Sequence, residues 1–590
     1  MDKLYKSKSK KFFANDHETW GHKWGYKDSR FILNDDRTVR MLGDRYELAG
    51  IDMPDFIPYV EEMLEVKIDP EDMLKQNEDM PIGPSNINEQ FVERIKGTFS
   101  DDRYTFADDD RLIHSHGQTT SDEVYKVLYS RIDSTVDMVF YIESEEDASK
   151  LIQLAEEFDV CLVPFGGGTS VSNALQIPKN ENRMIVAIDT RRMNSIEWIN
   201  EKDRRVCAQS GITGSRLEEL LEEKGFTVGH EPDSIELSTL GGWIATNASG
   251  MKKNRYGNIE DIVENVTMIT PKGDINQVEP LTRASIGMKP QNLLFGSEGN
   301  FGIITKATLK IHRLPEVQKF NSAVFPNWRT GVDFMYDLSH TNFIPASARL
   351  VDNVQFRFGQ TLKARPEGLE KLIENIKKFM VLNIKGFDPY QMVAATFKME
   401  GSREEVDYQE KNIARLTKKH GGLVGGAENG KRGYMLTFAI AYVRDFLTDY
   451  KVIGETMETS VPWSKIHQVC EAATKRLFDL HEQHGIPGRP YMSYRIPQIY
   501  HTGVCIYFML GMSVKDVENA ADLFSSMEHS IREAIMENGG SISHHHGVGK
   551  LRKDFMQDTI SPASIDLLKQ VKRSHDPKNI FGIQNNVFTD

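Results

Sequence analysis

PFGGGTSVSNAL, residues 164–175, is the stretch that decides the fold of this chain. Consecutive glycines carry no Cβ, so several backbone N–H groups can turn toward one anion such as a pyrophosphate. A Rossmann dinucleotide site needs G-x-G-x-x-G after a strand and at the start of a helix. Here Val171 replaces the third glycine, and the next apolar run, residues 184–188, has the character of a strand. The context excludes a Rossmann site and leaves two alternatives, a tight turn or another phosphate-binding loop.

Two more segments rich in glycine and small polar residues follow. They are GHEPDSIELSTLGGWIATNASGMKKNRYGNIEDIV, residues 229–263, and LLFGSEGNFGIITKATLKIHRLPE, residues 293–316. Small residues let the backbone approach a flat ring system, and Ser, Thr and Asn supply polar contacts to it. In this order the three segments resemble the FAD-binding domain of the vanillyl-alcohol oxidase/p-cresol methylhydroxylase (PCMH-type) superfamily. DPKNIFG, residues 576–582, is similar to the closing segment of that superfamily.

This resemblance implies an α+β fold with a two-subdomain PCMH-type FAD-binding domain and a cap domain. We expect a partly helical N-terminal extension over residues 1–85, the FAD domain over 86–316, the cap over 317–570, and a C-terminal segment, 571–590, that returns to the FAD domain. The cap pattern predicts a mainly antiparallel sheet with helices on one face. Its expected strands are 391–399, 434–443 and 504–510. Its expected helices are 366–380, one opened by a Ser402/Glu405 capping box, one after Pro462, and one ending at Gly539–Gly540.

Composition narrows the class of protein. The charge balance is 72 Lys+Arg against 86 Asp+Glu, a net −14, which argues against a sequence-independent nucleic-acid binder. Four cysteines without a CxxC pair argue against a disulfide-stapled secreted chain. No apolar stretch approaches the roughly 20 residues that span a bilayer. The five lysines within residues 1–11 lead into no apolar region, so they are no secretory signal. We expect a soluble, intracellular enzyme of several domains.

The string GGSISHHHGVGKLRK, residues 539–553, carries three consecutive histidines. In extended backbone His544 and His546 would point together and His545 away, so the three could not all bind one metal. No nearby Cys, Asp or Glu completes a zinc pattern in the sequence. We therefore predict no metal and a hydrogen-bonded catalytic cluster, with polar histidines at a turn as the alternative.

This string, together with HTGVCIYF (501–508), PASARLVDN (345–353), AYVRDF (441–446) and KWGYKDSRF (23–31), resembles the alkyldihydroxyacetonephosphate synthase family. The resemblance implies exchange of the acyl chain of 1-acyl-dihydroxyacetone phosphate for a long-chain fatty alcohol, in ether-lipid (plasmalogen) synthesis. It implies a redox-neutral reaction in which non-covalently bound FAD acts as a covalent trap. It also implies a homodimer that contacts the lumenal side of the peroxisomal membrane.

Carried over by motif, the resemblance implies that Tyr507 is the catalytic acid/base, assisted by His544, His545 and His546. We expect a histidine imidazolium to lower the pKa of the phenol. Arg349 matches an arginine that holds the departing carboxylate, and Arg444 matches one that binds the substrate phosphate. Without the family, Tyr507 would be a core aromatic, and the arginines would be surface ion pairs with Asp352 or Asp445.

The same resemblance assigns the FAD contacts to the three glycine-rich segments. His230 and Ser297 are expected near the isoalloxazine ring. The full predicted set is Pro164, Phe165, Gly166, Gly167, Gly168, Thr169, Ser170, His230, Asp233, Ser234, Ile235, Glu236, Leu237, Ser238, Thr239, Thr246, Asn247, Ala248, Ser249, Ser297, Glu298, Gly299, Asn300, Phe301, Gly302, Ile303 and Ile304.

Some features depart from the family, and two rival functions stay open. No peroxisomal address is legible at either end, and no amphipathic basic helix stands out for membrane contact. One rival is a flavin-dependent 2-hydroxyacid dehydrogenase on the same scaffold, which reduction of the flavin by lactate or 2-hydroxyglutarate would favour. The other is a non-catalytic flavin-dependent scaffold on a lipid surface, which inertness toward acyl-dihydroxyacetone phosphate would favour.

Overall fold

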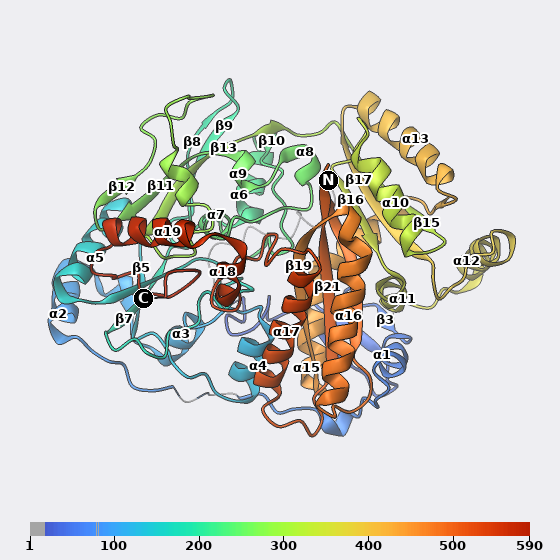
Figure 1. The fold of residues 1–590 in the computed structure, drawn as a ribbon, viewed down its shortest axis with the longest axis horizontal. Helices are drawn as coiled ribbons and strands as arrows, with labels where there is room; N and C mark the ends of the chain where they lie inside the picture. The colour runs from blue at the N-terminus through green and yellow to red at the C-terminus, as the bar shows by residue number, and fades with distance from the viewer. Residues whose placement is uncertain (1–17, 78–79, 81, 590) are drawn as a thin grey trace.

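The computed structural model describes residues 18–77, 80 and 82–589. The lysine-rich residues 1–11, the last residue and part of the segment after residue 77 lie outside this description. The described residues form two lobes that meet along a broad interface (Figure 1). The first lobe holds β4 to β14, and the second is built around a large sheet formed by β15 to β21.

The first lobe contains the glycine loop at the end of a mostly parallel sheet. Strands β5 (Met138–Tyr141), β7 (Ile185–Asp189) and β6 (Cys161–Phe165) pair in parallel, and β4 (Tyr104–Thr105) adds antiparallel to β5. Helix α5 (Glu145–Phe158) links β5 to β6 and begins after Ser144, whose side chain accepts from the Asp147 N–H. β6 therefore delivers residues 166–170 to the edge of the sheet.

A second sheet carries the other two glycine-rich segments. Among the described residues its antiparallel order is β12 (Gly273–Ile275), β11 (Val263–Thr270), β13 (Ile303–Lys310), β9 (Arg205–Gln209) and β8 (Ile196–Asn200). The turn at residues 296–302 enters β13. Helix α7 (Leu240–Thr246) begins at Thr239, whose hydroxyl accepts from the Gly242 N–H. The two sheets are the two subdomains that the sequence predicts.

The second lobe confirms the predicted antiparallel sheet. Within the described chain it has seven strands, in the order β18 (Leu423–Val424), β15 (Val317–Phe325), β17 (Val393–Gly401), β16 (Ser347–Val351), β20 (Tyr491–Ile499), β21 (Gly503–Ser513) and β19 (Val452–Pro462). Neighbouring strands are antiparallel throughout. The strands predicted at 391–399 and 504–510 are β17 and β21.

The prediction of helices on one face is wrong. Helices α10 (Trp328–Ser339), α13 (Arg403–Lys419), α16 (Ile466–Gln483) and α17 (Ala520–Glu537) cover one face in a common core with the sheet. Helices α11 (Asn353–Thr361), α14 (Ala427–Met435) and α15 (Ile440–Asp449) lie toward the first lobe and belong to a different core. The sheet is therefore a middle layer, and its second face is available for the interface between the lobes.

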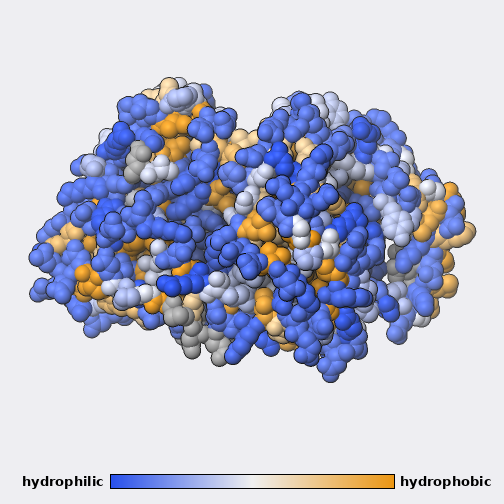
Figure 2. Space-filling model, turned by 60° about the horizontal axis from the view of Figure 1, so that its bottom comes forward, coloured by the Kyte–Doolittle hydropathy of each residue, from blue (hydrophilic) through white to orange (hydrophobic). Residues whose placement is uncertain are grey.

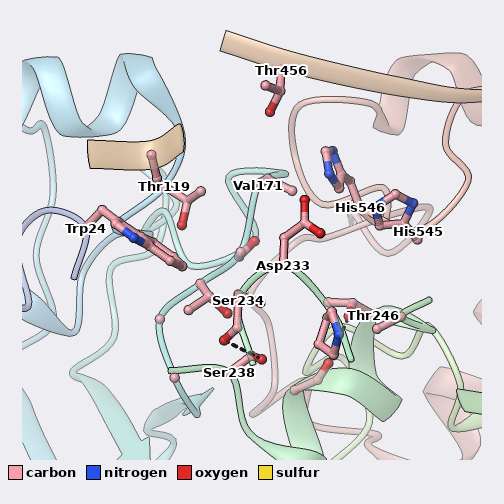
Figure 3. Close-up of a pocket in the computed structure, with 18 of the residues that line it drawn as sticks. Trp24, Thr119, Val171, Asp233, Ser234, Ser238, Thr246, Thr456, His545 and His546 are labelled. Carbon is pink, nitrogen blue, oxygen red and sulfur yellow. Dashed lines mark hydrogen bonds between the residues drawn. The ribbon is translucent and has the colours of Figure 1, made fainter. Parts of the chain in front are cut away.

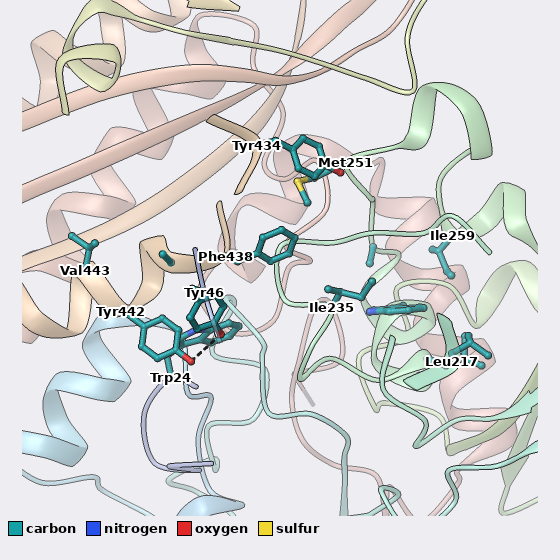
Figure 4. Close-up of a cluster of buried hydrophobic side chains, with 14 of the residues drawn as sticks. Trp24, Tyr46, Leu217, Ile235, Met251, Ile259, Tyr434, Phe438, Tyr442 and Val443 are labelled. Carbon is teal, nitrogen blue, oxygen red and sulfur yellow. Dashed lines mark hydrogen bonds between the residues drawn. The ribbon is translucent and has the colours of Figure 1, made fainter. Parts of the chain in front are cut away.

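The strand predicted at residues 434–443 is also wrong, because this stretch is helical. Tyr434, Phe438, Tyr442 and Phe446 are buried at intervals of four residues, which is the spacing of one helix face. Figure 4 shows Tyr434, Phe438 and Tyr442 among the buried side chains, with Tyr46 of the N-terminal region beside Tyr442. Their hydroxyl oxygens are 3.1 Å apart.

The N-terminal region packs onto both lobes. It contains β1 (Arg30–Leu33), β2 (Val39–Leu42) and β3 (Asp52–Met53), which form a small sheet, and helix α1 (Phe56–Leu64). The C-terminal segment after α19 (Pro562–His575) returns to the first lobe, where the Leu162 N–H donates to the Ile580 carbonyl at 2.7 Å. The domain boundaries themselves stay predictions.

Candidate active site

A cavity of about 360 Å³ lies between the lobes and is lined by residues of both (Figure 3). In the close-up, Ser234, Ser238 and Thr246 approach it from the first lobe. Thr456, His545 and His546 approach it from elements of the second lobe and the segment after it. Most of the predicted FAD contacts line this cavity. They are Pro164, Phe165, Gly166, Gly167, Gly168, Thr169, Ser170, Asp233, Ser234, Ser238, Thr239, Thr246, Ala248, Ser249, Ser297, Glu298, Gly299, Gly302, Ile303 and Ile304.

The remaining predicted FAD contacts lie behind the lining and support it. Glu236 accepts a hydrogen bond from the Tyr46 hydroxyl at 2.8 Å, and Asn247 ends α7 with a left-handed backbone. His230 is buried against the indole of Trp243, with ring centroids 4.7 Å apart. The residues of this supporting group are His230, Ile235, Glu236, Leu237, Asn247, Asn300 and Phe301.

Two features of the cavity wall suit a dinucleotide cofactor: a closely packed glycine loop and buried hydroxyl groups without a partner. A Cβ on Gly166 would lie 2.5 Å from Thr239 Oγ1, and one on Gly167 would overlap the Leu237 carbonyl, so the loop packs closely only because these residues are glycines. The hydroxyls of Ser210 and Ser297 line the cavity, are buried, and have no hydrogen-bond partner among the described residues. Buried hydroxyls are normally paired, so both are available to a ligand.

Strand alternation places four polar side chains on the sheet face that looks toward this cavity. Tyr507 on β21 is the register partner of Glu458 on β19 and of Arg495 on β20. Their neighbours in sequence, such as Met457, Ile506 and Phe508, enter the core on the opposite face. Arg349 on β16 is flanked by the core residues Ala348 and Leu350 in the same way. Because successive side chains point to opposite faces, these polar groups share the face that faces the first lobe.

The histidines lie differently from the prediction, because residues 544–546 form bends and no strand. His546 and His545 line the cavity, whereas His544 turns to Tyr500, with its Nε2 2.6 Å from the phenol oxygen. His544 and His545 face each other, with their Nδ1 atoms 2.8 Å apart. His546 Nε2 lies 2.9 Å from the hydroxyl of Tyr507. The hydrogen-bonded cluster exists, but His545 and His546 share a side.

The sequence argument against a metal assumed that no Cys, Asp or Glu lies near the histidines, and this assumption is wrong. Glu458, Cys505, His544 and His545 bring potential ligand atoms within 4.8 Å of one another. The donors are engaged with the protein, however. Glu458 accepts from backbone amides of the histidine segment, and His544 contacts both Tyr500 and His545. We therefore describe the group as a hydrogen-bonded cluster, and the absence of a metal stays a prediction.

The protonation states also differ from expectation. Burial, reinforced by the carboxylate of Asp233, raises the pKa of Tyr507, and the guanidinium of Arg495 opposes this shift. Burial lowers the pKa of His544 to about 3 and holds the pKa of His546 well below its usual range. The prediction that an imidazolium lowers the pKa of the phenol is wrong, because burial disfavours the charged form of both groups. Both shifts favour the uncharged forms, so a neutral phenol and a neutral imidazole share the 2.9 Å hydrogen bond.

The two predicted arginines lie in different places. Arg444 lines the cavity and donates from Nε to Asp445 Oδ1 at 2.9 Å and from Nη1 to the Thr119 carbonyl. Arg349 is buried and donates to Thr437 Oγ1 at 2.5 Å; its described contacts do not include Asp352. It lines a second cavity of about 730 Å³. The pairing that the alternative named, Arg444 with Asp445, is present, but Arg444 lines the cavity and the pair is mostly buried. The catalytic and phosphate-binding roles of the two arginines stay predictions.

Two family models match the chain in the same order as its lobes. The model described as FAD binding domain matches residues 136–279, and the model of the C-terminal domain of FAD linked oxidases matches residues 314–582. The chain is 40% identical to alkyldihydroxyacetonephosphate synthase of Caenorhabditis elegans, over 95% of this chain and 94% of the relative. The chain belongs to the alkyldihydroxyacetonephosphate synthase family. It is an FAD-dependent enzyme.

Other relatives agree with this family. The alkyldihydroxyacetonephosphate synthase of Dictyostelium discoideum is 28% identical over 86% of this chain and 82% of the relative. A solved structure of an alkyldihydroxyacetonephosphate synthase superposes with a TM-score of 0.83 at 25% identity and covers 98% of this chain and 99% of that one. p-Cresol methylhydroxylase, at 13% identity with a TM-score of 0.63 over 85% of this chain and 98% of its own, shares the fold.

Residue-by-residue reading of the sequence missed two polar groups of this synthase site. Arg495 lies in YMSYRIPQIY and stacks over the Tyr507 ring, with its guanidinium 4.3 Å from the ring centroid. Glu458 lies in VIGETMETSVP and is fully buried. The available signal was a charged residue alternating with apolar residues on a strand, because such a residue is either exposed or functional. Thr119, from a segment before the FAD domain's first parallel strand, also lines the cavity.

Proposed function

We propose that this protein is an alkylglycerone-phosphate synthase, which exchanges the acyl chain of 1-acyl-dihydroxyacetone phosphate for a long-chain alcohol. The observation that carries the substrate class is a pair of cavities that meet at four shared lining residues, Phe358, Thr437, Ile440 and Arg495. Arg495 lines both the cavity of the glycine loops and the cavity of about 730 Å³. The second cavity contains many apolar side chains, among them Phe358, Leu362, Leu382 and Leu436. A small 2-hydroxyacid has no use for such a space, whereas an aliphatic chain does.

We assign each site residue a role in cofactor binding or in catalysis. The glycine loop at 166–168 would hold the FAD pyrophosphate, and Ser297 and Ser210 would give polar contacts to the bound cofactor. When bound, FAD supplies the covalent trap of the family's redox-neutral exchange. Tyr507 moves a proton between its oxygen and a substrate hydroxyl, and His546 Nε2 accepts the phenol proton. Arg349 lies where the two cavities approach Arg495 and would stabilise the carboxylate that leaves.

Delivery of such chains supports peripheral contact with a membrane. Helix α12 (Gly368–Phe379) stands at the far end of the second lobe and continues into a π-helix, Met380–Ile384 (Figure 1). Leu369, Leu372 and Ile376 are among its largely exposed side chains. Figure 2 shows hydrophobic residues gathered at that end of the molecule. The sequence prediction found no such helix convincing, but its exposed apolar side makes α12 the membrane-contacting element of this proposal.

The second cavity connects this helix with the chemistry. Its lining includes Val381 and Leu382, which follow α12, and Arg349 and Arg495 at the other end. A chain entering beside α12 would therefore reach the polar face of the sheet without crossing water. Within the part of the chain that the structure describes, no helix combines the length and apolar character needed to cross a membrane.

The test is exchange of labelled hexadecanol into 1-acyl-dihydroxyacetone phosphate by purified, FAD-loaded protein. The proposal requires labelled ether product and released fatty acid in equal amounts, with no net reduction of the flavin. Flavin reduction by D-lactate or 2-hydroxyglutarate without exchange would favour the dehydrogenase. An FAD-loaded protein inert in both assays would favour the non-catalytic scaffold.

Assembly and location complete the proposal. The family resemblance supports a homodimer on the lumenal side of the peroxisomal membrane. Analytical ultracentrifugation of the full chain and imaging of a tagged copy beside a peroxisomal marker test these two points. A monomer, or a location outside peroxisomes, would remove the corresponding part of the proposal and leave the chemistry untouched.

A further inference from the structure

Glu458 is a buried carboxylate to which the proposed reaction assigns no role. It lies directly behind the Tyr507–His546 pair. It is the register partner of Tyr507 on the neighbouring strand, and its side chain has no exposed surface. An unpaired buried carboxylate is costly, so such a group requires compensating donors or charges.

The compensating donors come from the histidine segment. Glu458 Oε1 accepts from the hydroxyl of Ser543 at 2.7 Å and from the N–H of His546 at 2.9 Å and of His545 at 3.2 Å. Its Oε2 accepts from the N–H of His544. One carboxylate thus fixes the backbone of the whole segment, and both of its oxygens are in use. A glutamine amide would direct its NH₂ group at one of these donors.

The side chain of His546 shows a second function of the same carboxylate. The Tyr507 hydroxyl and His546 Nε2 are 2.9 Å apart, and the relay takes the hydroxyl as the donor, which places the proton of neutral His546 on Nδ1. Nδ1 lies 3.7 Å from Glu458 Oε1 and has no hydrogen-bond partner within the described chain. At that distance Glu458 acts on the ring through its charge. The sequence tyrosine hydroxyl, imidazole, carboxylate follows the logic of a serine-protease triad.

We propose that Glu458 is a positioning residue that completes a Tyr507–His546–Glu458 proton relay. This inference rests on the proposed synthase function. As a substrate hydroxyl loses its proton to Tyr507 Oη, the phenol's own proton passes to His546 Nε2. The imidazolium that forms is balanced by the carboxylate of Glu458. The step is a proton transfer without oxidation or reduction. The proton returns by the same route when the ether product or the fatty acid is protonated.

The other charges around His546 make this balance necessary. Burial, His545, Arg552 and Arg532 all disfavour the imidazolium, and Glu458 is the group that favours it. Arg532 comes from α17 and donates to the backbone carbonyls of Glu458 and Ile542 at 3.3 and 2.7 Å. Arg552 follows the histidine segment and donates to the carbonyls of Val171 and Gly547. Without the carboxylate, the guanidinium groups of Arg552 and Arg532 would be the strongest remaining charges on His546, and both are positive.

The decisive variant is Glu458→Gln, compared with the parent protein in the hexadecanol exchange assay. We expect unchanged FAD content and a kcat about 100-fold lower at neutral pH, at the lower end of general acid–base contributions. The acid-side midpoint of the kcat profile should move downward by about one pH unit, because loss of the carboxylate lowers the pKa of the His546 imidazolium and makes His546 a weaker base. In a Tyr507→Phe background, Glu458→Gln should cost less than about threefold, because groups that act as a unit are not additive.

Asp352→Asn is the matched control, because Asp352 is another buried carboxylate that accepts a backbone N–H, from Gln355 at 2.8 Å. It should leave kcat and its pH profile unchanged. An active parent protein combined with a Glu458→Gln rate within about threefold and an unmoved profile would overturn the relay, as would a full cost in the Tyr507→Phe background. An inactive parent protein would instead overturn the proposed function.

A measurement on the parent protein applies even if the variant does not fold. In ¹⁵N-histidine NMR of the FAD-loaded protein, the His546 signals are those lost in His546→Gln. The relay requires the proton on Nδ1 at neutral pH, and a proton on Nε2 would contradict it.

Discussion

At the residue scale, the Tyr507 phenol is held in its neutral form by the site and is not pre-ionised. Burial and Asp233 raise its pKa, and the neighbouring histidines are neutral, so proton transfer must be concerted with the arrival of substrate. The Tyr507 hydroxyl and His546 Nε2 lie 2.9 Å apart, within hydrogen-bonding distance. A proton can therefore pass in either direction without a stable phenolate, which suits a reaction that both removes and returns a proton.

Tyr507→Phe should fold, bind FAD with an ordinary flavin spectrum and lose ether synthesis at least about 100-fold. The ring still packs on β21, and only the hydroxyl that contacts His546 is removed. Labelled-alcohol exchange and FAD content measure the two effects. Near-normal exchange would show that Tyr507 is only a packed aromatic residue.

The two arginines should separate in their kinetics. Arg444→Ala should mainly raise KM, because a lost phosphate contact weakens ground and transition states alike. Arg349→Ala should mainly lower kcat, because carboxylate charge develops as the acyl group leaves. Initial rates over a range of acyl-dihydroxyacetone phosphate concentrations give both constants. Equal changes in KM and kcat for both variants would remove the distinction.

At the element scale, patterns in the sequence predicted those strands and helices whose burial has one period. Val504, Ile506 and Phe508 enter one core from the same face of β21, whereas Tyr507 between them is only partly buried, and α13 begins at its predicted Ser402 cap. Residues 434–443 misled the prediction because they are apolar almost throughout, and a short apolar run does not reveal its period. Arg495 and Glu458 were missed for a related reason. Their function comes from neighbours on other strands, and pairing between strands distant in sequence cannot be seen in one strand alone.

Asp352 at the start of α11 gives a pH-dependent prediction. Burial raises its pKa from 3.8 to about 7, so the folded state holds a proton that the unfolded state has lost. Stability therefore falls as pH rises from about 4 to about 7. Asp352→Asn keeps a helix-capping oxygen without this loss. Its gain in Tm over the parent should grow through that range and level off above about pH 7. A gain independent of pH, measured by calorimetry, would contradict this account.

Helix α12 carries the prediction for membrane contact. The triple variant Leu369→Ser, Leu372→Ser and Ile376→Ser should weaken binding to phosphatidylcholine vesicles at least about tenfold, since each change removes apolar surface from the bilayer interface. Exchange of a short-chain, water-soluble alcohol should be unaffected. The control is Val278→Ser with Met288→Ser, two exposed apolar residues of the first lobe. Equal loss of vesicle binding in both variants would argue against a specific role for α12.

At the scale of the whole molecule, one FAD would contact all three glycine-rich segments, which lie far apart in the sequence. We expect one FAD per chain, released by acid denaturation, because the cavity offers close-packed glycines and hydroxyls for non-covalent binding. Release of the flavin into the supernatant and an FAD-dependent rise in Tm would confirm this. Flavin that stays with the precipitated polypeptide would show a covalent link.

The C-terminal segment has a consequence for how the enzyme is made in the cell. Asn585 is fully buried and donates to the carbonyls of Ala174 and Glu298, although it follows Ala174 by 411 positions. The wall of the flavin site that begins with the glycine loop therefore cannot close while the ribosome is still synthesising the second lobe. Nascent chains must keep this incomplete site protected for most of translation. A premature stop before residue 585 would yield a protein that binds no FAD and is therefore colourless.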